Sequence, residues 1–530
     1  MIIRSTLRCS AVRRLPVYRA RLLQAKPRRY STSAPLAQPP SSSPASMLGP
    51  FTNELDRIAP KFEIQGSQIN VLRTPSEFYE TLKSKILSAE KRIFLSTLYI
   101  GKTEHELIAT LQQALRAKPK LKLSILTDAL RGTRESPEPS CASLLAPLVL
   151  EFGEERVEIR MYHTPNLTGL RKKYIPKRIN EGWGLQHMKL YGMDDEIIIS
   201  GKSLKRLLHK PPRQIPRLLL KRDNKLLLQP PHRSLTPQLP RHALRPRTSR
   251  LHPRMAHLEP RPLTTHFTIR VHHSILQTPE TAHPTYRYLN NSIVHQYHYL
   301  PNLPTNPSLP PSTDASTELP SITSILTTIS HPSYVNSSWT FTAGYFNPDP
   351  SLTSLLLSTS SRNNTVITAS PWANGFYGSK GVSGLLPAAY TLLSRRFLER
   401  VQKSGREGDI ILKEWRRGTV GEKEGWTYHA KGLWVSLNKN EDAKGEKGMV
   451  SIVGSSNYTK RSYSLDLETG VAIVTKDEGL IKRLGEERDG LGDEKWAREV
   501  GMDEFIKTDR RVSWRVRVAM WIVGVVGGAL

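Results

Sequence analysis

Cysteine is scarce in this sequence, and no long apolar run occurs. Cys9 and Cys141 are the only two cysteines among 530 residues, so no framework of disulfide bonds is expected. No stretch reaches the ~20 consecutive apolar residues that a membrane-spanning helix needs. The chain is nevertheless long enough to form two domains with sizeable hydrophobic cores.

Acidic residues are absent from the beginning of the chain. The first is Glu54, and nine Lys and Arg precede it, with Ser and Thr between them. Such an Arg-rich, acid-free start is typical of a mitochondrial presequence, and the sequence Arg-Arg-Tyr-Ser at 28–31 resembles a matrix-processing site. We predict a presequence over residues 1–35, and a disordered basic tail is the alternative.

Glycine is absent between Gly201 and Gly344, although the chain contains 33 glycines. Within this interval, residues 202–313 hold 18 Lys and Arg against three acidic residues, which accounts for half of the net charge of +30. They also hold 18 of the 39 prolines and 11 of the 16 histidines. A segment of this composition cannot bury enough apolar surface to offset the entropy of ordering it.

We therefore predict that residues 202–313 are an aberrant segment, frame-shifted or mis-spliced, that loops out irregularly between two folded halves. A genuine basic, proline-rich disordered insert that binds acidic lipid or nucleic acid is the alternative. The net charge of the whole chain would ordinarily favour nucleic acid or an anionic membrane. Because much of this charge lies in residues 1–35 and 202–313, we expect no specific nucleic-acid partner.

The pattern His-x-Lys occurs twice, at residues 187–189 and 429–431. Each copy is followed by a β-rich run that ends in glycine and small polar residues, at 196–201 and 450–457. Residues two apart on a strand point to the same face, so the His and Lys of each copy can enter one cavity. The repetition predicts two halves that fold onto one shared site.

Two imidazoles and two ammonium groups in one cavity suit phosphoryl transfer without a metal ion. One imidazole attacks phosphorus, the other protonates the departing oxygen, and the lysines hold the charge on the non-bridging oxygens. A histidine can take either role because its pKa lies near neutrality. The predicted catalytic residues are therefore His187, Lys189, His429 and Lys431, with no cofactor and no metal.

Apolar runs alternate with helical patterns in both halves, which predicts α/β layers. A capping box with proline at the first helical position, Thr-Pro-Ser-Glu at 74–77, predicts the start of a helix. The other elements expected in the first half are strands at 92–100, 121–127, 157–162 and 195–200 and a helix at 104–116. Those expected in the second half are strands at 339–346, 364–369, 429–436 and 450–453 and a helix at 385–401.

Extending the first copy gives His187, Lys189 and Asp194, the His-x-Lys-x4-Asp signature of the phospholipase D superfamily. Two flanking stretches, Tyr-His-Thr-Pro-Asn-Leu at 162–167 and Leu-Gln-His-Met-Lys-Leu-Tyr-Gly at 185–192, resemble a more specific group. They are similar to the mitochondrial CDP-diacylglycerol–glycerol-3-phosphate 3-phosphatidyltransferases, the phosphatidylglycerophosphate synthases of fungi and animals. The resemblance adds Asp194 to the candidate catalytic residues.

The resemblance covers about residues 50 to 201 and resumes from about 315. It implies an α/β fold of two similar phospholipase D-like halves, with mixed β-sheets flanked by helices and the active site at their interface. The predicted domains are a presequence at 1–35, a first half at 50–201, the aberrant segment at 202–313, a second half at 314–510 and a membrane-associating tail at 511–530.

The activity implied by the resemblance is transfer of a phosphatidyl group from CDP-diacylglycerol to sn-glycerol 3-phosphate, with release of CMP. This is the first committed step towards phosphatidylglycerol and cardiolipin. The implied intermediate is a phosphatidyl-histidine, with His187 as nucleophile and His429 as acid and then base, or the reverse. A related phosphatidyltransferase with another acceptor, a phosphodiesterase that uses water, and a non-catalytic basic membrane- or nucleic-acid-binding protein are the alternatives.

Three further positions bear on the resemblance. Ser436 stands where the second copy would have its Asp, and family members also depart there. Asn457 stands where the superfamily places a polar residue that orients the histidines, although a turn at the end of a strand would also explain it. Glu468 resembles the family's downstream acid, which would hold a histidine through its second nitrogen; a surface carboxylate is the alternative.

Residues 371–384 are rich in glycine and polar donors just before an expected helix. Backbone N–H groups at such a place suit an anion such as the pyrophosphate of a nucleotide lipid or glycerol 3-phosphate. The spacing is not that of a P-loop, so ATP is not implied. The candidate substrate-binding residues are Asn374, Gly375, Gly378, Ser379 and Lys380, and a purely structural loop is the alternative.

Basic residues near the first motif and near the C-terminus point to acidic ligands. Arg171 and Lys172 could bind the acceptor phosphate or lipid headgroups, although a solvated basic face is the alternative. Residues 518–530 are largely apolar and follow several arginines, which fits an interfacial anchor on an anionic leaflet. We expect a peripheral protein on the matrix side of the mitochondrial inner membrane; a buried C-terminal helix is the alternative.

Overall fold

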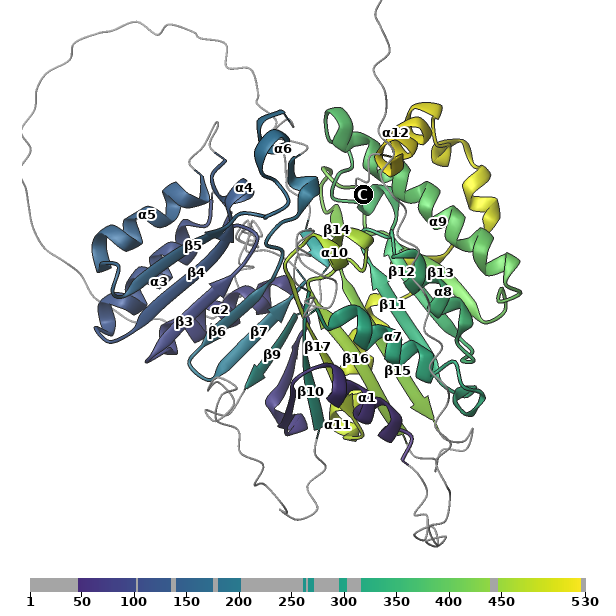
Figure 1. Cartoon of the computed structure of the whole chain (residues 1–530), viewed down its shortest axis with the longest axis horizontal. Helices are drawn as coiled ribbons and strands as arrows, with labels where there is room; N and C mark the ends of the chain where they lie inside the picture. The colour runs from purple at the N-terminus through teal and green to yellow at the C-terminus, as the bar shows by residue number, and fades with distance from the viewer. Residues whose placement is uncertain are drawn as a thin grey trace, which may run out of the picture. The chain divides into compact units, whose positions relative to one another are not determined.

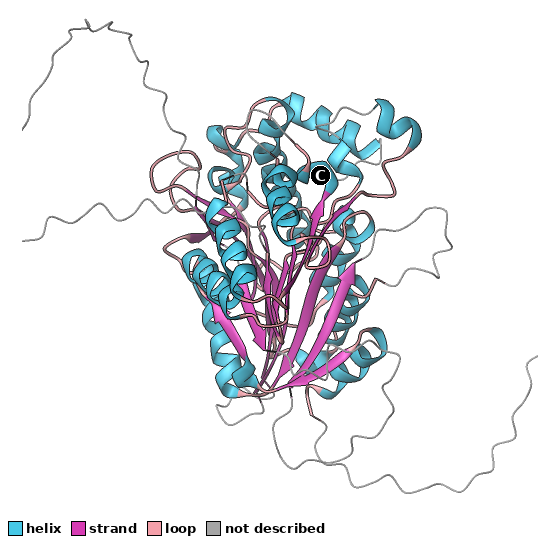
Figure 2. Ribbon diagram, turned by 90° about the vertical axis from the view of Figure 1, so that its left-hand side faces the viewer, coloured by secondary structure: helices cyan, strands magenta, loops and turns pink. Residues whose placement is uncertain are grey.

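Strands from both halves of the chain form two large β-sheets (Figure 1). The computed structural model describes residues 46–101, 103–134, 140–174, 180–201, 261–263, 266–270, 295–302, 316–438 and 447–525. The predicted presequence lies outside these residues. Figure 2 shows the strands in the interior and helices along their outer faces.

The first half builds a seven-stranded sheet with the order β2-β9-β7-β6-β3-β4-β5. Its strands are β2 (Ile69–Leu72), β3 (Arg92–Ser96), β4 (Lys122–Asp128), β5 (Val157–Tyr162), β6 (Leu190–Met193), β7 (Glu196–Ser200) and β9 (His266–Arg270). The main helices beside it are α2 (Pro75–Ser88), α3 (His105–Ala117) and α5 (Cys141–Phe152). As predicted, Thr74 caps α2, because its side chain accepts a hydrogen bond from Glu77 N.

The second sheet has nine strands in the order β1-β10-β17-β16-β15-β11-β12-β13-β18. Most of them come from the second half, but β1 and the helix Gly49–Ile58 come from the predicted first half and β10 comes from the segment 202–313. The strands of this sheet are β1 (Lys61–Ile64), β10 (His295–Asn302), β11 (Ser338–Ala343), β12 (Asn364–Ala369), β13 (Ile410–Trp415), β15 (Lys431–Asn438), β16 (Lys447–Gly454), β17 (Glu468–Thr475) and β18 (Ala497–Glu499). The helices include α1 (Gly49–Ile58), α7 (Glu318–Thr328), α8 (Pro350–Ser358), α9 (Leu386–Lys403), α11 (Glu478–Leu491) and α12 (Trp514–Val525).

The two sheets repeat one arrangement. In the first, β3, β4 and β5 are parallel and β6 runs antiparallel to β3. In the second, β11, β12 and β13 are parallel and β15 runs antiparallel to β11. Since β6 begins just after the first His-x-Lys motif and β15 begins at the lysine of the second, the repeat places the two motifs at equivalent positions. The predicted α/β fold of two similar halves with mixed sheets is confirmed.

A shared hydrophobic cluster joins the halves. Ile197 and Ile199 of β7 belong to the same buried cluster as Val453 of β16 and Ile473 of β17. Helix α11 packs against both β2 and β16, and Arg483 on it donates a hydrogen bond of 2.6 Å to the carbonyl of Gly66. Burying an isoleucine side chain contributes ~1.5–3 kcal/mol, so this cluster fixes one half against the other.

The prediction that residues 202–313 loop out irregularly is wrong for the strands that the structure describes in this segment, because they pair with strands of both halves. Strand β9 pairs with β2 and β7, and β10 pairs with β1 and β17; a short strand, β8 (Arg261–Leu263), pairs with β14 (Trp426–Tyr428). Without β9 and β10, β7 and β17 would present unpaired N–H and C=O groups. Backbone pairing satisfies those groups whatever side chains the added strand carries. The remaining residues of the segment lie outside the described part, and its aberrant origin stays a prediction.

Candidate active site

A cavity of about 620 Å³ opens between the halves, and both His-x-Lys motifs reach it. The first half lines it with Tyr99, Arg131, Arg134, Glu181, His187 and Lys189. The second half lines it with Tyr345, Gly375, His429, Asn457, Arg461 and Asp466. The cavity therefore lies at the interface between the halves, where the repeated motif predicts a shared site.

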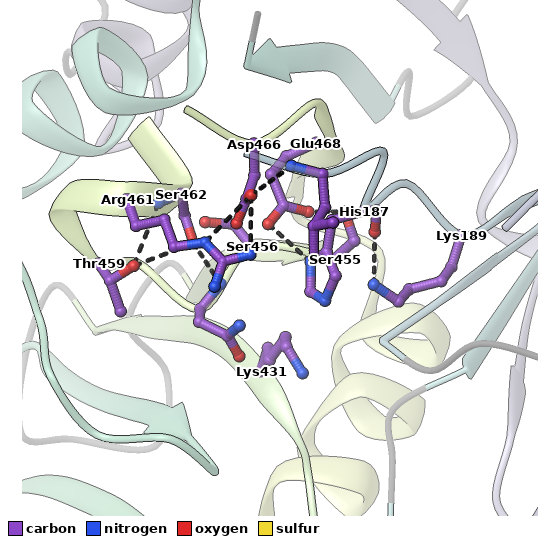
Figure 3. Close-up of polar contacts among 12 residues, drawn as sticks. His187, Lys189, Lys431, Ser455, Ser456, Thr459, Arg461, Ser462, Asp466 and Glu468 are labelled. Carbon is purple, nitrogen blue, oxygen red and sulfur yellow. Dashed lines mark hydrogen bonds and ion pairs between the residues drawn. The ribbon is translucent and has the colours of Figure 1, made fainter. Parts of the chain in front are cut away.

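The imidazole of His187 is held by a carboxylate from the opposite half (Figure 3). Its Nδ1 lies 2.8 Å from Oε1 of Glu468, the first residue of β17. A carboxylate accepts hydrogen bonds, so Nδ1 carries the proton and Nε2 keeps its lone pair. The backbone of His187 is tied to the same segment, because its N–H donates to the carbonyl of Leu467 at 2.8 Å. This geometry presents Nε2 as a nucleophile.

Burial dominates the electrostatics of this pair. It lowers the pKa of His187 well below its usual range, and the charge of Lys189 acts in the same direction. Burial raises the pKa of Glu468 to about 7, while Lys189 and a hydrogen bond from Ser455 act to lower it. His187 is therefore neutral at physiological pH, the form that a nucleophile requires.

An ion pair between Arg461 and Asp466 lies beside this hydrogen bond. The guanidinium of Arg461 donates to Oδ1 of Asp466, with Nη2 at 3.1 Å and Nε at 3.2 Å. The same carboxylate oxygen accepts the N–H of Leu185 from the first half at 2.9 Å. The short helix α10 (Lys460–Ser464), which carries Arg461, and Asp466 just after it are thus fastened to the backbone before His187.

His429 lies among aromatic and cationic neighbours. Its ring packs edge-on against Tyr345, with centroids 4.8 Å apart. The ammonium of Lys431 lies 2.9 Å from Nδ1 of His429 and donates to the carbonyl of Gly201 in the first half at 3.3 Å. Gly344 packs closely behind, since a Cβ there would lie 2.8 Å from the Cα of His429. Only glycine allows this approach.

The expectation that each histidine lies on a strand is wrong by a few residues. Strand β6 begins at Leu190 and β15 begins at Lys431, so both histidines precede their strands. Lys189 turns inward, is almost fully buried and hydrogen-bonds the carbonyl of His187. Burial lowers the pKa of Lys189 to about 7, so a phosphate oxygen nearby would favour its charged form.

Asp194 lies outside the cavity lining. It occupies the turn between β6 and β7 with a φ of 50°, and its carboxylate accepts the N–H groups of Glu90, Lys91 and Arg92 at 2.7 to 2.9 Å. These hydrogen bonds lower the pKa of Asp194. The geometry supports a role in fastening this turn to the start of β3, in place of the predicted catalytic role.

The other predicted residues divide between cavity and surroundings. Asn457 lines the cavity, and its Oδ1 is buried without a hydrogen-bond partner among the described residues. The cavity-lining members of the glycine-rich loop include Gly375 and Ser379. Asn374 is buried and accepts from Phe376 N at 2.9 Å, and neither Gly378 nor Lys380 belongs to the lining. Arg171 and Lys172 lie exposed on α6 (Gly169–Tyr174), also outside the lining.

Sequence reasoning missed several residues that complete the site. Arg461, Ser455 and Asp466 lie within a short stretch before or beside Glu468, but isolated polar residues there carry no spacing signal. Tyr345 comes just after β11, and an aromatic residue at that place gives no signal of function. Arg131 and Arg134 come directly after β4, and polar residues at the carboxyl end of a parallel strand are a usable signal.

A metal ion would have to compete with existing contacts. The ligand atoms of His187, Asp466 and Glu468 lie within 4.8 Å of one another. However, Asp466 already accepts from Arg461, and Ser455 donates to Glu468. A cation there would also add to the charge of Lys189 and Lys431. The donor set fits a hydrogen-bonded histidine better, and a reaction without metal stays a prediction.

Two His-x-Lys motifs that face one cavity between similar halves place this chain in a class of two-half α/β proteins with mixed sheets. A solved structure agrees in fold: phosphatidylserine synthase of Haemophilus influenzae has a TM-score of 0.60 at 17% identity, covering 90% of this chain and 97% of its own. No protein-family model matches the chain.

Curated relatives give the particular family. The chain is 38% identical over 530 residues to CDP-diacylglycerol–glycerol-3-phosphate 3-phosphatidyltransferase of Saccharomyces cerevisiae, covering 95% of this chain and 99% of that protein. It is 31% identical over 464 residues to the mitochondrial human protein of the same name, covering 82% and 79%. The chain belongs to the CDP-diacylglycerol–glycerol-3-phosphate 3-phosphatidyltransferase family.

The position of Asp194 predicts a stability effect. Asp194→Asn should lower the free energy of unfolding by about 1–3 kcal/mol, because three backbone donors lose their ionised acceptor. Its kcat should change little, since the residue lies outside the cavity. Chemical denaturation and steady-state kinetics measure both. Asp195→Asn, at the half-buried neighbouring position, is the control and should be near neutral in both, because its carboxylate lies 3.8 Å from Arg92 Nη2 in a loose surface ion pair. A large loss of kcat with unchanged stability in Asp194→Asn would restore the catalytic role.

The His187–Glu468 pair predicts a pH dependence. Glu468, with a pKa of about 7, gains a proton as the pH falls through that value and then no longer carries the negative charge that stabilises a positive His187. The kcat of the wild type should therefore fall below about pH 7. Glu468→Gln should lower kcat by about 10²- to 10⁴-fold and remove this acid limb.

Ser455→Ala is the matched variant for that pH profile. Since the Ser455 hydroxyl lowers the pKa of Glu468, its removal should shift the acid limb to higher pH. Profiles of kcat from about pH 5 to 9 compare the three proteins. An acid limb that persists unchanged in Glu468→Gln would assign the titration to another group.

Proposed function

We propose that this protein transfers a phosphatidyl group from CDP-diacylglycerol to sn-glycerol 3-phosphate and releases CMP. The single observation that carries the proposal is the orientation of His187 by Glu468 in the cavity that His429 also lines. The names of the relatives supply the substrates. Phosphatidylglycerophosphate, the product, leads to phosphatidylglycerol and cardiolipin.

The first step forms a bond between Nε2 of His187 and the phosphorus of the phosphatidyl group. The bond from that phosphorus to the CMP oxygen breaks, and protonated His429 donates its proton to the departing CMP. Lys189 and Lys431 stabilise charge on the non-bridging oxygens. The result is a phosphatidyl-histidine at His187 and a neutral His429.

The second step reverses these roles. Neutral His429 takes the proton from a hydroxyl of glycerol 3-phosphate as the oxygen attacks phosphorus, and the phosphorus–nitrogen bond to His187 breaks. Both histidines return to their starting forms. His187 is assigned as nucleophile because it has the carboxylate that a developing positive imidazole needs. A phosphodiesterase differs only in using water for this second step.

The two-histidine mechanism predicts strong non-additivity. His187→Ala and His429→Ala should each lower kcat by about 10³-fold or more, and the double variant should be no slower than the worse single variant. Release of CMP with and without glycerol 3-phosphate is the measurement. CMP release that does not depend on the acceptor would indicate hydrolysis, and substantial activity in either single variant would contradict a site shared by both motifs.

We also propose that the protein lies on the matrix face of the mitochondrial inner membrane. Relatives from chicken, mouse and human are named as mitochondrial. No helix among the described residues is long and apolar enough to cross a membrane. Helix α12 packs on α9 (Figure 1), with Val516 buried and Trp514 and Trp521 each 69% exposed. Exposed aromatic residues beside arginines suit an anionic interface.

The double variant Trp514→Ala, Trp521→Ala tests this attachment. It should bind vesicles of phosphatidylcholine and cardiolipin about tenfold more weakly than the wild type, because two interfacial aromatic side chains are lost. Co-sedimentation measures the binding. Leu150→Ala, at an 86% exposed position on α5, is the control and should bind normally. Unchanged binding of the double variant would remove α12 from the membrane contact.

A further inference from the structure

The proposed reaction brings two phosphorylated substrates into one cavity. Lys189 and Lys431 lie beside the two histidines, where the reacting phosphorus must sit. Arg461 is engaged with Asp466. The acceptor carries a phosphomonoester with a charge of roughly −1.5 to −2 at neutral pH, and it needs cations away from the reacting phosphorus. The inference that follows rests on the proposed function.

Two arginines that line the cavity lie outside the histidine cluster. Arg131 and Arg134 follow β4 in the first half. Nη2 of Arg131 lies 2.9 Å from Oε2 of Glu181, and Arg134 forms an ion pair with the same carboxylate. The arginine side chains are 33% and 38% exposed, whereas Glu181 is 14% exposed. Two guanidinium groups against one more deeply placed carboxylate leave net positive charge facing the cavity.

Arg131 is held in a fixed relation to both histidines. Asp128 accepts the backbone N–H of Arg131 and that of Gln186, each at 2.9 Å, which ties this turn to the residue before His187. Arg131 lines the same cavity as Tyr345 and His429, and the ring of Tyr345 packs edge-on against that of His429.

Arg131 also has an unmet hydrogen-bonding demand. Its Nε is buried and has no hydrogen-bond partner among the described residues. A buried donor without a partner costs free energy until a ligand or water satisfies it. Guanidinium groups bind phosphate oxygens through paired N–H donors, so a phosphomonoester would meet that demand.

We propose that Arg131 and Arg134 bind the phosphomonoester of the acceptor and so place its free hydroxyl at His429. This subsite selects an alcohol that carries its own phosphate over water or an unphosphorylated alcohol. Binding of the acceptor's phosphate to the two arginines thus orients the acceptor's hydroxyl, which does not itself contact the arginines.

The test separates the two substrates kinetically. The double variant Arg131→Gln, Arg134→Gln should raise KM for glycerol 3-phosphate at least tenfold and leave KM for CDP-diacylglycerol within about twofold. Arg131→Lys, which keeps the charge, should recover part of the loss. Arg116→Gln removes an arginine from a surface ion pair with Glu151 in the same half and should behave as wild type. Thermal unfolding of each variant reports its folding.

Inorganic phosphate provides a probe that does not depend on turnover. It should compete with glycerol 3-phosphate in the wild type, and calorimetric binding of phosphate to the intact protein should be lost in the double variant. A rise in KM for CDP-diacylglycerol instead would overturn the inference and assign the arginines to the nucleotide. Unchanged KM values, or phosphate binding that survives the double substitution, would also overturn it.

Failure of the proposed function would look different. If the wild type released no CMP with glycerol 3-phosphate, the acceptor itself would be wrong. Loss of phosphate binding in the double variant would then still support an anion subsite at Arg131 and Arg134. Wild-type transfer to glycerol 3-phosphate with no effect of the arginine substitutions would instead refute the subsite alone.

Discussion

The hydrogen bond between His187 and Glu468 crosses from one half of the protein to the other, and the chemistry of the site depends on it. Neither group could serve alone. Without Glu468 the imidazole would have no fixed orientation, and without its partners the carboxylate would be a buried charge that costs several kcal/mol. The site is therefore assembled only when the halves meet, which couples folding of the interface to activity.

The neighbouring contacts explain why this bond can be held accurately. Leu467 exchanges backbone hydrogen bonds with Leu185 and His187, and Asp466 accepts from Leu185 as well. The buried cluster that contains Ile197, Ile199, Val453 and Ile473 packs across the same interface. Backbone bonds on both sides of the reactive histidine leave its side chain little freedom, which is what preorganisation for a phosphorus transition state requires.

Buried charge is balanced across the site. Lys189, Lys431 and Arg461 face Glu468 and Asp466, and burial shifts the pKa of Lys189 and that of Glu468 to about 7 from opposite directions. A phosphate group that enters this cluster would favour the charged form of Lys189. The unliganded site thus holds less charge than its composition implies, and substrate supplies the counter-charge.

The sequence alone determined the family, the two-half α/β plan and the four His and Lys residues. These follow from local signals: a motif repeated in the same strand and glycine context, a capping box that predicted the start of α2, and apolar runs that predicted β5 and β12 closely. Local signals are reliable there because short-range hydrogen bonding and side-chain alternation decide such elements.

Only the tertiary structure decided which polar residues meet. Asp194 satisfies the motif yet fastens a turn, because its neighbours in space are the N–H groups of residues 90–92. Arg131 carries no motif yet faces the cavity. Strands β9 and β10 join the sheets despite an unfavourable composition, because the sheet edges need backbone partners. Contacts between residues far apart in the chain depend on how the halves pack, and no local pattern encodes that.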